Sequence, residues 1–311
     1  MGIAEPTTLP WRLFDVEVRR LTRIGPSFLR VTFTGADLDR LADNGFDQRI
    51  KLVFPLARHG FRHLPTGPDW YARWRELPAE RRNPFRTYTV RAVRPAVAEL
   101  DVDMVLHGDA GPASRWAGAA SPGDRLMVLG PNADHAGDHG GREFRPPVPG
   151  GVTLLAGDET AVPAIAAILG RLPATARGAA LLEVPHPGDI LDLPAPPGMT
   201  ITWLPRGAGR HGSRLVPAVQ AATARLLPEP SAPATVPVMA VSGSAAASAA
   251  AGEEPLWEVP DTPASLGCAA WLAGEAGMVR ELRRHLVGER GLDRRSVAFM
   301  GYWRRGRSED G

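Results

Sequence analysis

Hydrophobic and polar residues alternate along much of the first half of the chain, which is the pattern of strands with one buried face. Five short stretches carry it, at residues 14–18, 28–34, 50–54, 99–106 and 124–129. Gly- and Pro-containing turns separate them, and residues 55–85 have the pattern of a long loop with one short helix. Because hardly any helix interrupts these strands, the pattern predicts a small, closed antiparallel β-barrel.

From residue 151 onward the pattern changes to continuous apolar runs that alternate with helical periodicity. Buried strands are predicted at 152–156, 179–184, 200–204, 268–273 and 296–303. Helices are predicted from Thr160 to about Leu172, from Ser213 to Leu227 and from Met278 to Glu289. Alternating strands and helices are typical of a Rossmann-like parallel α/β domain.

The amino-acid composition predicts where the domain boundary lies. Residues 130–150 are rich in Gly, Pro, Asp and His, so we predict a β-barrel domain at 1–149 and an α/β domain at 150–311. Residues 228–263 are dominated by Pro, Ala and Ser and bury too little apolar surface to offset the entropy of ordering. We predict a disordered insertion there, with the alternative that Leu256 and Trp257 fold back near the cleft.

Charge and cysteine content narrow the function. The chain has 311 residues and a formal charge of +2, which gives no reason to expect nucleic-acid binding. Lys51 is the only lysine, and the single Cys268 excludes an internal disulfide and an all-cysteine iron–sulfur cluster. No signal or membrane-spanning pattern is present. We expect a cytoplasmic protein without stable membrane association, with no metal site and plausibly monomeric.

The first candidate binding motif is R-x-Y-T-x-R, formed by Arg86, Tyr88, Thr89 and Arg91. A tyrosine ring stacks on a planar group, and arginine forks onto phosphate or carboxylate. A flavin dinucleotide combines both features. The competing interpretation is an ordinary strand with solvated arginines.

A second candidate follows in the run from His107 to Ala117, where Gly and Pro set a tight turn before a helix. Ser114 is the expected N-cap, with the helix starting at Arg115. Free backbone N–H groups at a helix start bind phosphate. Alone this signal is weak, because small-residue turns before helices are common.

The second half offers a strand, tight turn and helix at Gly157, Asp158, Glu159 and Thr160, the geometry of dinucleotide binding. Thr160 is the expected N-cap. The Gly-rich fingerprint is absent, and both carboxylates would repel phosphate, so they must point outward, cap the backbone or face the flavin cleft. Arg206 heads an Arg- and Gly-rich loop that either grips the 2′-phosphate of NADPH or is a mobile surface loop.

In this order, and with G-D-E-T-A-x-P-A-I at 157–165 and Y-W-R-x-G at 302–306, the motifs resemble those of the siderophore-interacting protein family. These are FAD-dependent ferric-siderophore reductases of the ferredoxin-reductase-like superfamily. The resemblance implies an FAD-binding barrel followed by a nicotinamide-dinucleotide domain. It assigns the following residues to the flavin, its phosphates and its isoalloxazine edge: Arg86, Tyr88, Thr89, Arg91, His107, Gly108, Gly111, Pro112, Ala113 and Ser114.

The resemblance also implies roles in the second domain. Gly274 and Glu275 sit where related reductases meet the nicotinamide, and Tyr302 or Trp303 covers the flavin face until nicotinamide displaces it. Lys51 and Arg304 are the expected contacts of an anionic ferric siderophore. For Lys51 a surface lysine on an edge strand is the equal alternative, and for the two aromatic residues the alternative is packing at a domain edge.

The predicted function is reduction of ferric siderophores by NADPH or NADH through FAD, which releases ferrous iron. The flavin carries the chemistry, so no catalytic side chain is assigned. Two other functions stay open: a flavin reductase with another diffusible or protein acceptor, and a non-catalytic siderophore-binding protein. The identity of the siderophore is not predicted.

Overall fold

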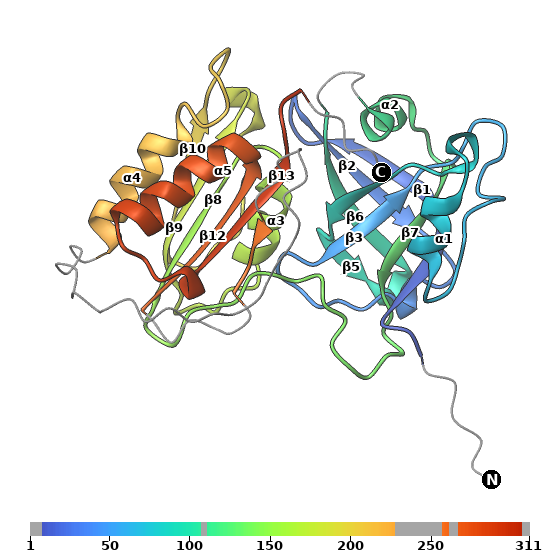
Figure 1. The fold of residues 1–311 in the computed structure, drawn as a ribbon, viewed down its shortest axis with the longest axis horizontal. Helices are drawn as coiled ribbons and strands as arrows, with labels where there is room; N and C mark the ends of the chain where they lie inside the picture. Colours follow the sequence, from blue (N-terminus) through green and yellow to red (C-terminus); the bar gives the residue numbers. More distant parts are fainter. Residues whose placement is uncertain (1–7, 107–110, 228–256, 261–266, 307–311) are drawn as a thin grey trace, which may run out of the picture.

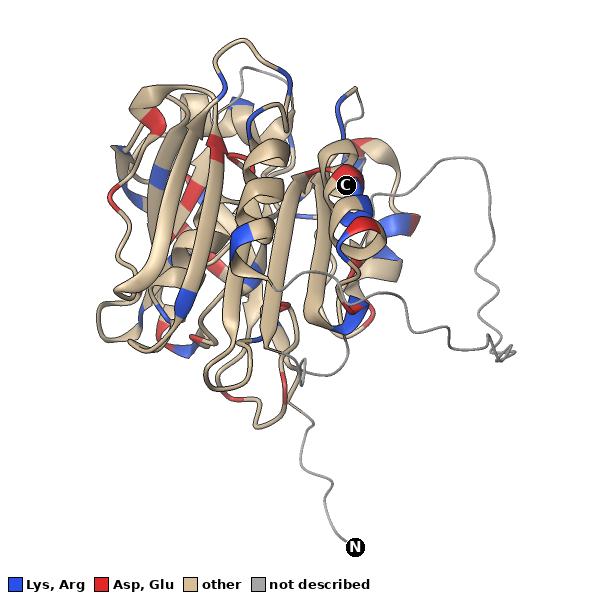
Figure 2. Cartoon of the chain, turned by 90° about the vertical axis from the view of Figure 1, so that its left-hand side faces the viewer, with Lys and Arg blue, Asp and Glu red and all other residues tan. Residues whose placement is uncertain are grey.

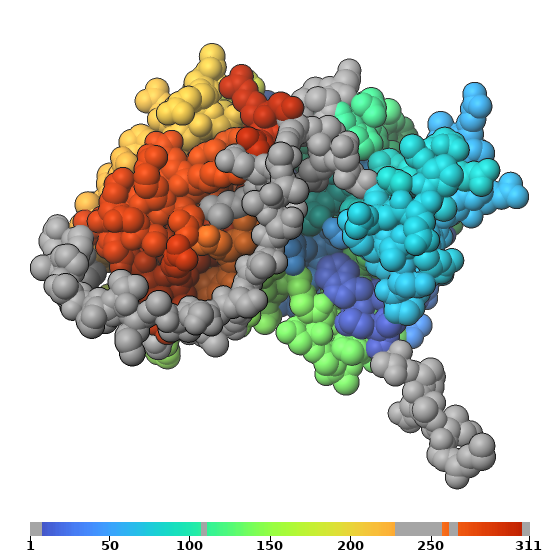
Figure 3. All heavy atoms as spheres, in the orientation of Figure 1, coloured from blue at the N-terminus to red at the C-terminus, as the bar shows by residue number. Residues whose placement is uncertain are grey.

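The protein consists of two β-sheet domains that lie side by side (Figures 1 and 3). The computed structural model describes residues 8–106, 111–227, 257–260 and 267–306. Strands between residues 11 and 131 build the first sheet, and strands between 152 and 303 build the second. Basic and acidic positions are interspersed along the ribbon (Figure 2), and the net charge of the chain is low. In the described part of the chain no helix is long and apolar enough to span a membrane.

The first sheet is antiparallel and curls into a half-barrel, with the strand order β4-β3-β7-β1-β2-β6-β5. Its strands are β1 (Trp11–Arg23), β2 (Phe28–Thr34), β3 (Arg49–Val53), β4 (Phe85–Thr89), β5 (Ala92–Arg94), β6 (Glu99–Val105) and β7 (Arg125–Pro131). The expected barrel is therefore confirmed, but in the described strands it is not closed by hydrogen bonds, because β4 and β5 form its two edges.

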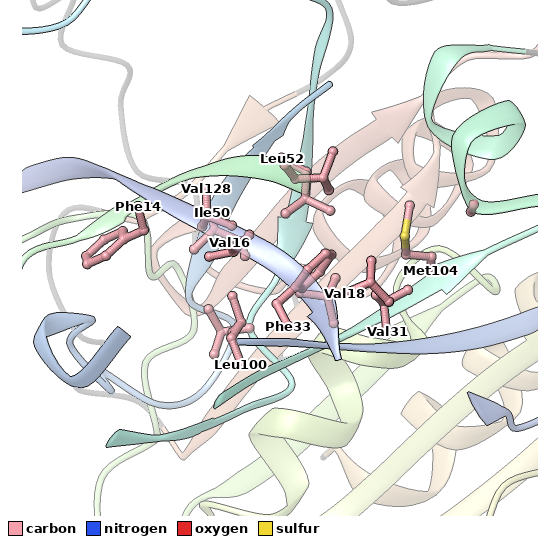
Figure 4. Packing of buried hydrophobic residues seen from close by; sticks show 14 of the residues in the cluster. Phe14, Val16, Val18, Val31, Phe33, Ile50, Leu52, Leu100, Met104 and Val128 are labelled. Carbon is pink, nitrogen blue, oxygen red and sulfur yellow. The ribbon is translucent and has the colours of Figure 1, made fainter. Parts of the chain in front are cut away.

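The apolar side chains of the predicted alternating pattern fill the interior of the half-barrel. On β1 the side chains of Phe14, Val16 and Val18 are buried, while those of Asp15 and Glu17 face outward. They pack against apolar side chains of β2, β3, β6 and β7 (Figure 4). Two short helices belong to this domain, α1 (Trp70–Glu76) in the long loop and α2 (Pro112–Ala119) after β6.

The second sheet has five parallel strands and one antiparallel edge strand, in the order β10-β9-β8-β12-β13-β11. Its strands are β8 (Val152–Gly157), β9 (Arg177–Val184), β10 (Gly198–Pro205), β11 (Trp257–Glu258), β12 (Cys268–Glu275) and β13 (Val297–Trp303). Helix α3 (Val162–Leu169) covers the face toward the first domain (Figure 1). Helices α4 (Leu215–Leu226) and α5 (Ala276–Arg283) cover the other, and α5 continues as a π-helix (Arg284–Glu289). This confirms the Rossmann-like prediction.

Short 3-10 turns connect the larger elements. They span Leu38–Arg40, Ala79–Arg81, Pro95–Val97, Pro187–Asp189 and Arg294–Ser296.

Two helix starts differ from the sequence prediction. Helix α2 begins at Pro112 after Gly111, two residues before Ser114, because proline is tolerated at the first helical position, where its missing N–H costs little. Helix α3 begins at Val162 after Ala161. Thr160 is not its N-cap, because its hydroxyl donates to Asp158 instead.

The insertion predicted at 228–263 lies mostly outside the described residues. Within it, residues 257–260 are described, and Trp257 and Glu258 form β11, paired with Met300 and Phe299 of β13. For these two residues the expectation of disorder does not hold, and the alternative that Trp257 folds back is supported. Pairing with β13 gives the backbone groups of this short strand hydrogen-bond partners. The composition of the segment does not reveal this pairing.

Two buried carboxylates join the domains, one reaching from each side. Asp47 of the first domain accepts a hydrogen bond of 2.9 Å from the indole of Trp271 in β12. Asp189 of the second domain accepts from the backbone N–H and the hydroxyl of Ser27, at 2.7 and 2.9 Å. Phe28, the next residue, is buried in the cluster around α3. These contacts set how the two domains sit against each other.

We expect the substitution Asp189→Ala to lower the free energy of unfolding by about 2–4 kcal/mol, because it leaves the buried donors of Ser27 without an acceptor. Urea denaturation followed by tryptophan fluorescence measures the change. Asp192→Ala removes an exposed carboxylate three residues away and serves as the matched control. Equal stability of both variants would contradict a joining role for Asp189.

Candidate functional site

The strand order creates a topological switch point at the carboxyl end of the second sheet, between β8 and β12. The chain leaves β8 toward β9 on one side, and β12 lies on the other side, so the direction of winding reverses between β8 and β12. In open α/β sheets, ligands bind at the carboxyl ends of strands at such a switch point. Gly157 ends β8, and Gly274 and Glu275 end β12. The structure therefore brings together two motifs that are more than a hundred residues apart in sequence.

Asp158 follows β8 directly at this switch point and is fully buried. Its two carboxylate oxygens accept from the backbone N–H and hydroxyl of Thr160, from the N–H of Glu275 at 2.7 Å and from the indole of Trp303 at 3.0 Å. Of the three orientations left open by the sequence, backbone capping is the one observed. A side chain at Gly274 would come within 2.6 Å of this carboxylate, and its φ of +139° also favours glycine.

Glu159 is paired with Arg206. The guanidinium donates to both carboxylate oxygens of Glu159, at 2.6 and 2.7 Å, and His211 lies 3.1 Å from one of them. The side chains of Glu159 and Arg206 are 8% and 7% exposed, so this fork is closed to solvent. Arg206 is therefore held by a carboxylate at the start of its loop, whose next residues, 207–210, are exposed.

The two adjacent carboxylates have opposite pKa shifts. Burial, and then the charge of Glu159, raise the pKa of Asp158 to about 6. Burial acts in the same direction on Glu159, but the hydrogen bonds from His211 and Arg206 outweigh it and lower the pKa of Glu159 to about 2. At neutral pH Glu159 is thus the firmly ionised member of the pair.

The other residues near the switch point come from the ends of β12 and β13. The Glu275 side chain caps α5 by accepting from the N–H of Met278 at 2.9 Å. Trp303 meets His211 edge-on, with ring centroids 4.7 Å apart. Tyr302 stacks on Trp257 at 6.0 Å. Trp303 thus faces the turn after β8, and Tyr302 lies against the strand contributed by the insertion.

In the first domain, Arg86, Tyr88 and Thr89 lie on edge strand β4. Thr89 is buried, and Tyr88 packs partly against the barrel core. His107 and Gly108 lie outside the described residues. Gly111, Pro112, Ala113 and Ser114 form the start of α2, and no atom of the described residues lies within 4 Å of where a side chain at Gly111 would begin. The described part of the chain therefore leaves space beside Gly111.

Arg91 carries a buried guanidinium group that is only partly paired. Its Nε is buried and has no hydrogen-bond partner in the described structure. The nearest carboxylate, Asp103, is 3.6 Å away and is taken by a fork from Arg30 at 2.7 and 2.8 Å. Burial lowers the pKa of Arg91, so an anionic ligand at this position would stabilise it.

The two expected substrate contacts lie apart in sequence. Lys51 is at the centre of β3, where its Nζ lies 3.2 Å from the hydroxyl of Thr87 and 4.9 Å from the centroid of the Phe85 ring. β3 is bonded to β4 and β7, so Lys51 is not on an edge strand. Arg304 follows β13 and is half-buried. Lys51 lines a cavity of about 400 Å³.

Sequence reasoning missed several residues of these sites. His211 completes the Glu159 pair, and only its place in the Arg- and Gly-rich loop hinted at a role. Arg30 and Asp103, which surround Arg91, come from separate strands and carry no motif. Trp11 and Trp70 line the cavity beside Lys51. In the described part of the chain, no cluster of three or more His, Cys, Asp or Glu is arranged to hold a metal.

Two family profiles match the chain. The profile described as "Siderophore-interacting FAD-binding domain" matches residues 17–135, which contain the half-barrel. The profile described as "Siderophore-interacting protein" matches residues 152–306, which contain the second sheet.

Individual relatives match the chain over different lengths. Ferric vibriobactin reductase ViuB of Vibrio cholerae is 30% identical over 288 residues, 92% of this chain and 88% of that protein. The NADPH-dependent ferric-chelate reductase of Escherichia coli is 38% identical over 120 residues, 39% of this chain and 45% of that protein. The crystal structure of a siderophore utilization protein from T. fusca has a TM-score of 0.66 and 30% identity, covering 96% and 95% of the two chains.

The raised pKa of Asp158 predicts a pH dependence of stability. The folded protein holds this proton up to about pH 6, whereas the unfolded chain releases it near pH 4. Between these values the folded state binds more protons, so the free energy of unfolding should fall as pH rises.

Chemical denaturation at half-unit steps from pH 4 to 7 tests this. The difference between the wild type and Asp158→Asn should change over that range, because the variant cannot titrate at this position. A constant difference would show that the pKa of Asp158 is not raised.

Proposed function

Because the chain belongs to the siderophore-interacting protein family, we propose that it is an FAD-dependent oxidoreductase that uses NADPH or NADH to reduce ferric siderophores. The observation that carries the proposal is the pairing of two sites in one chain. Arg91 and the start of α2 fit an anionic flavin cofactor, and the switch point between β8 and β12 fits a dinucleotide. Relatives named for ferric reduction support the choice of reaction.

The first domain would hold FAD through the residues that the family resemblance assigns. Arg91 and Arg86 supply positive charge for the phosphates, and the N–H groups that begin α2 supply hydrogen bonds. Tyr88 supplies a ring for the planar part. When bound, FAD takes a hydride from the nicotinamide and passes electrons on singly, which a nicotinamide does not readily do.

The second domain would hold the nicotinamide cofactor at the ends of β8 and β12. Gly157 and Gly274 leave room for Ala161 and Asp158 to pack against the two strand ends, and the hydrogen bonds of Asp158 keep these ends together. Arg206 is bound by Glu159 and serves to shape the turn after β8. For a 2′-phosphate, the exposed Arg210 on the same loop is better placed than Arg206.

The substrate would be an anionic ferric chelate, and Lys51 with Arg304 would attract it. Reduction of the iron to the ferrous state weakens its charge-based hold on oxygen ligands and so favours release. The lone, buried Cys268 offers no route to a protein-bound iron–sulfur cluster, so electrons would leave from the flavin itself. Its burial raises the pKa of this thiol to about 11. The cytoplasmic location and the monomeric state remain predictions from the sequence.

The proposed reaction is tested anaerobically with purified protein loaded with FAD. NADPH or NADH should bleach the flavin absorbance, and a ferric siderophore added next should restore it while a ferrous chelator develops colour. Bleaching without reoxidation by ferric chelates would indicate a different electron acceptor. Protein that folds but takes up no FAD would overturn the proposal.

The contacts of Arg91 predict an unusual mutational pattern for FAD affinity. Arg91→Met should weaken FAD binding about 10- to 100-fold, the effect of losing a charge-assisted hydrogen bond. Arg30→Met should also weaken it, because Asp103 would then be released to pair with Arg91. The double substitution Arg30→Met and Asp103→Asn should recover much of this loss.

The measurement is the dissociation constant of FAD from protein freed of flavin, followed by flavin fluorescence. Arg19→Met is the matched control, because it removes a positive charge paired with Glu99 of the same sheet. If Arg19→Met and Arg30→Met weaken FAD equally, the effect is one of net charge and the assignment of Asp103 is wrong.

A further inference from the structure

Tyr302 lies between two tryptophan rings where the domains meet. The ring of Trp257 stacks on it, with centroids 6.0 Å apart and an angle of 23° between the planes. The ring of Trp271 meets it edge-on at 6.2 Å. Tyr302 packs on the sheet face that α3 covers, which is the face toward the first domain (Figure 1). The tyrosine ring is therefore held from two sides.

Each of these tryptophans also contacts the first domain. The guanidinium carbon of Arg49 lies 5.0 Å from the centroid of the Trp257 ring, a cation–π contact. The indole of Trp271 donates to the carboxylate of Asp47. Burial, followed by the charge of Asp47, raises the pKa of the Tyr302 phenol well above its ordinary value, and the charge of Arg49 acts against both. Tyr302 is thus surrounded by groups from both domains.

This aromatic stack is one strand away from the predicted flavin motif. Arg49 begins β3, and its register partner on β4 is Thr89. Thr89 is one of the residues that the family resemblance assigns to FAD. Trp303, the other candidate for covering the flavin, is instead bonded to Asp158 within the second domain. Of the two aromatic residues, Tyr302 is therefore the one held against the first domain.

The strand β11, which carries Trp257, has two anchors besides the ring. The backbone of Trp257 pairs with Met300 of β13. The next residue, Glu258, forms an ion pair of 3.0 Å with Arg283 of α5. Trp257 itself is 42% exposed, so truncating its ring leaves no buried cavity. The ring can therefore be removed while both anchors of the strand remain.

We propose that Trp257 is a positioning residue, which holds the ring of Tyr302 over the flavin site until the nicotinamide cofactor displaces it. The inference rests on the proposed function. An aromatic pair of this kind stabilises its arrangement beyond the area that it buries, and Tyr302 loses this contribution when it moves away. Trp257 therefore opposes binding of the nicotinamide cofactor, and its removal should tighten that binding.

The test measures the dissociation constants of NADP+ and NAD+ from the FAD-loaded protein by isothermal titration calorimetry. Because these oxidised cofactors do not reduce the flavin, binding is separated from electron transfer. Trp257→Ala should tighten the binding of either cofactor that the wild type binds by about 2- to 10-fold, the effect of losing one aromatic pair. Trp257→Phe keeps a ring that can stack and should stay within about twofold of the wild type.

A double-mutant cycle shows whether Trp257 acts through Tyr302. Tyr302→Ala should also tighten cofactor binding. Adding Trp257→Ala to it should change the affinity by less than about twofold, because the stack is already lost. Glu258→Gln is the matched control, because it breaks the ion pair with Arg283 on the same strand and leaves the stack in place. It should change the affinity by less than about twofold.

Flavin fluorescence provides a readout that needs no nicotinamide. A tyrosine ring next to the isoalloxazine quenches its fluorescence by electron transfer. Trp257→Ala and Tyr302→Ala should therefore both raise the fluorescence of bound FAD, and Glu258→Gln should not. Circular dichroism and FAD content show that each variant is folded and loaded.

The inference and the proposed function fail in different ways. Weaker or unchanged binding in Trp257→Ala, additive effects in the cycle, or unchanged flavin fluorescence would each overturn the positioning role, even if ferric siderophores are reduced. If neither nicotinamide cofactor binds the wild type, the proposed function is rejected. The fluorescence of Trp257→Ala then still decides whether Trp257 positions Tyr302: a rise supports this role, and no change overturns it.

Discussion

The buried carboxylate of Asp158 connects the ends of three strands in the second domain. It accepts hydrogen bonds from the turn after β8, from the end of β12 and from the end of β13. All of these buried donors can bond the carboxylate at once only in one arrangement. This requirement fixes the relative positions of the three strand ends. The neighbouring pair of Glu159 and Arg206 closes the same edge of the sheet. A ligand entering at the switch point thus meets a surface set before it arrives.

The same principle operates between the domains. Asp47 and Asp189 each reach across to a donor on the other domain, and both are buried. Electron transfer between two bound cofactors requires their reacting atoms to approach closely, and effective rates depend on that geometry. A domain interface held by oriented hydrogen bonds supports such an approach better than one made of apolar contacts alone.

In the first domain, the positively charged side chains have two kinds of surroundings. Arg30 neutralises Asp103 and leaves Arg91 without a full partner, next to strands that carry the flavin motif. Arg49 and Lys51 instead face a cavity with tryptophan walls. The first arrangement suits a phosphate group, whereas in the second Arg49 is already paired with Glu143. Family membership and these two local chemistries together support a flavoprotein that acts on iron chelates.

The sequence by itself determined the two fold types, because a period of two on 14–18 and alternating buried strands and helices after residue 151 each favour one architecture. It also singled out residues 86–91 and 157–160 as candidate flavin and dinucleotide motifs, since those patterns are local, and both assignments stay predictions. Only the tertiary structure decided the partners: Arg206 with Glu159, Trp303 with Asp158, and Arg30 with Asp103. It also moved the helix starts to Pro112 and Val162. The physical reason is that hydrogen-bonded pairs between distant segments depend on strand order and register, which no local periodicity encodes.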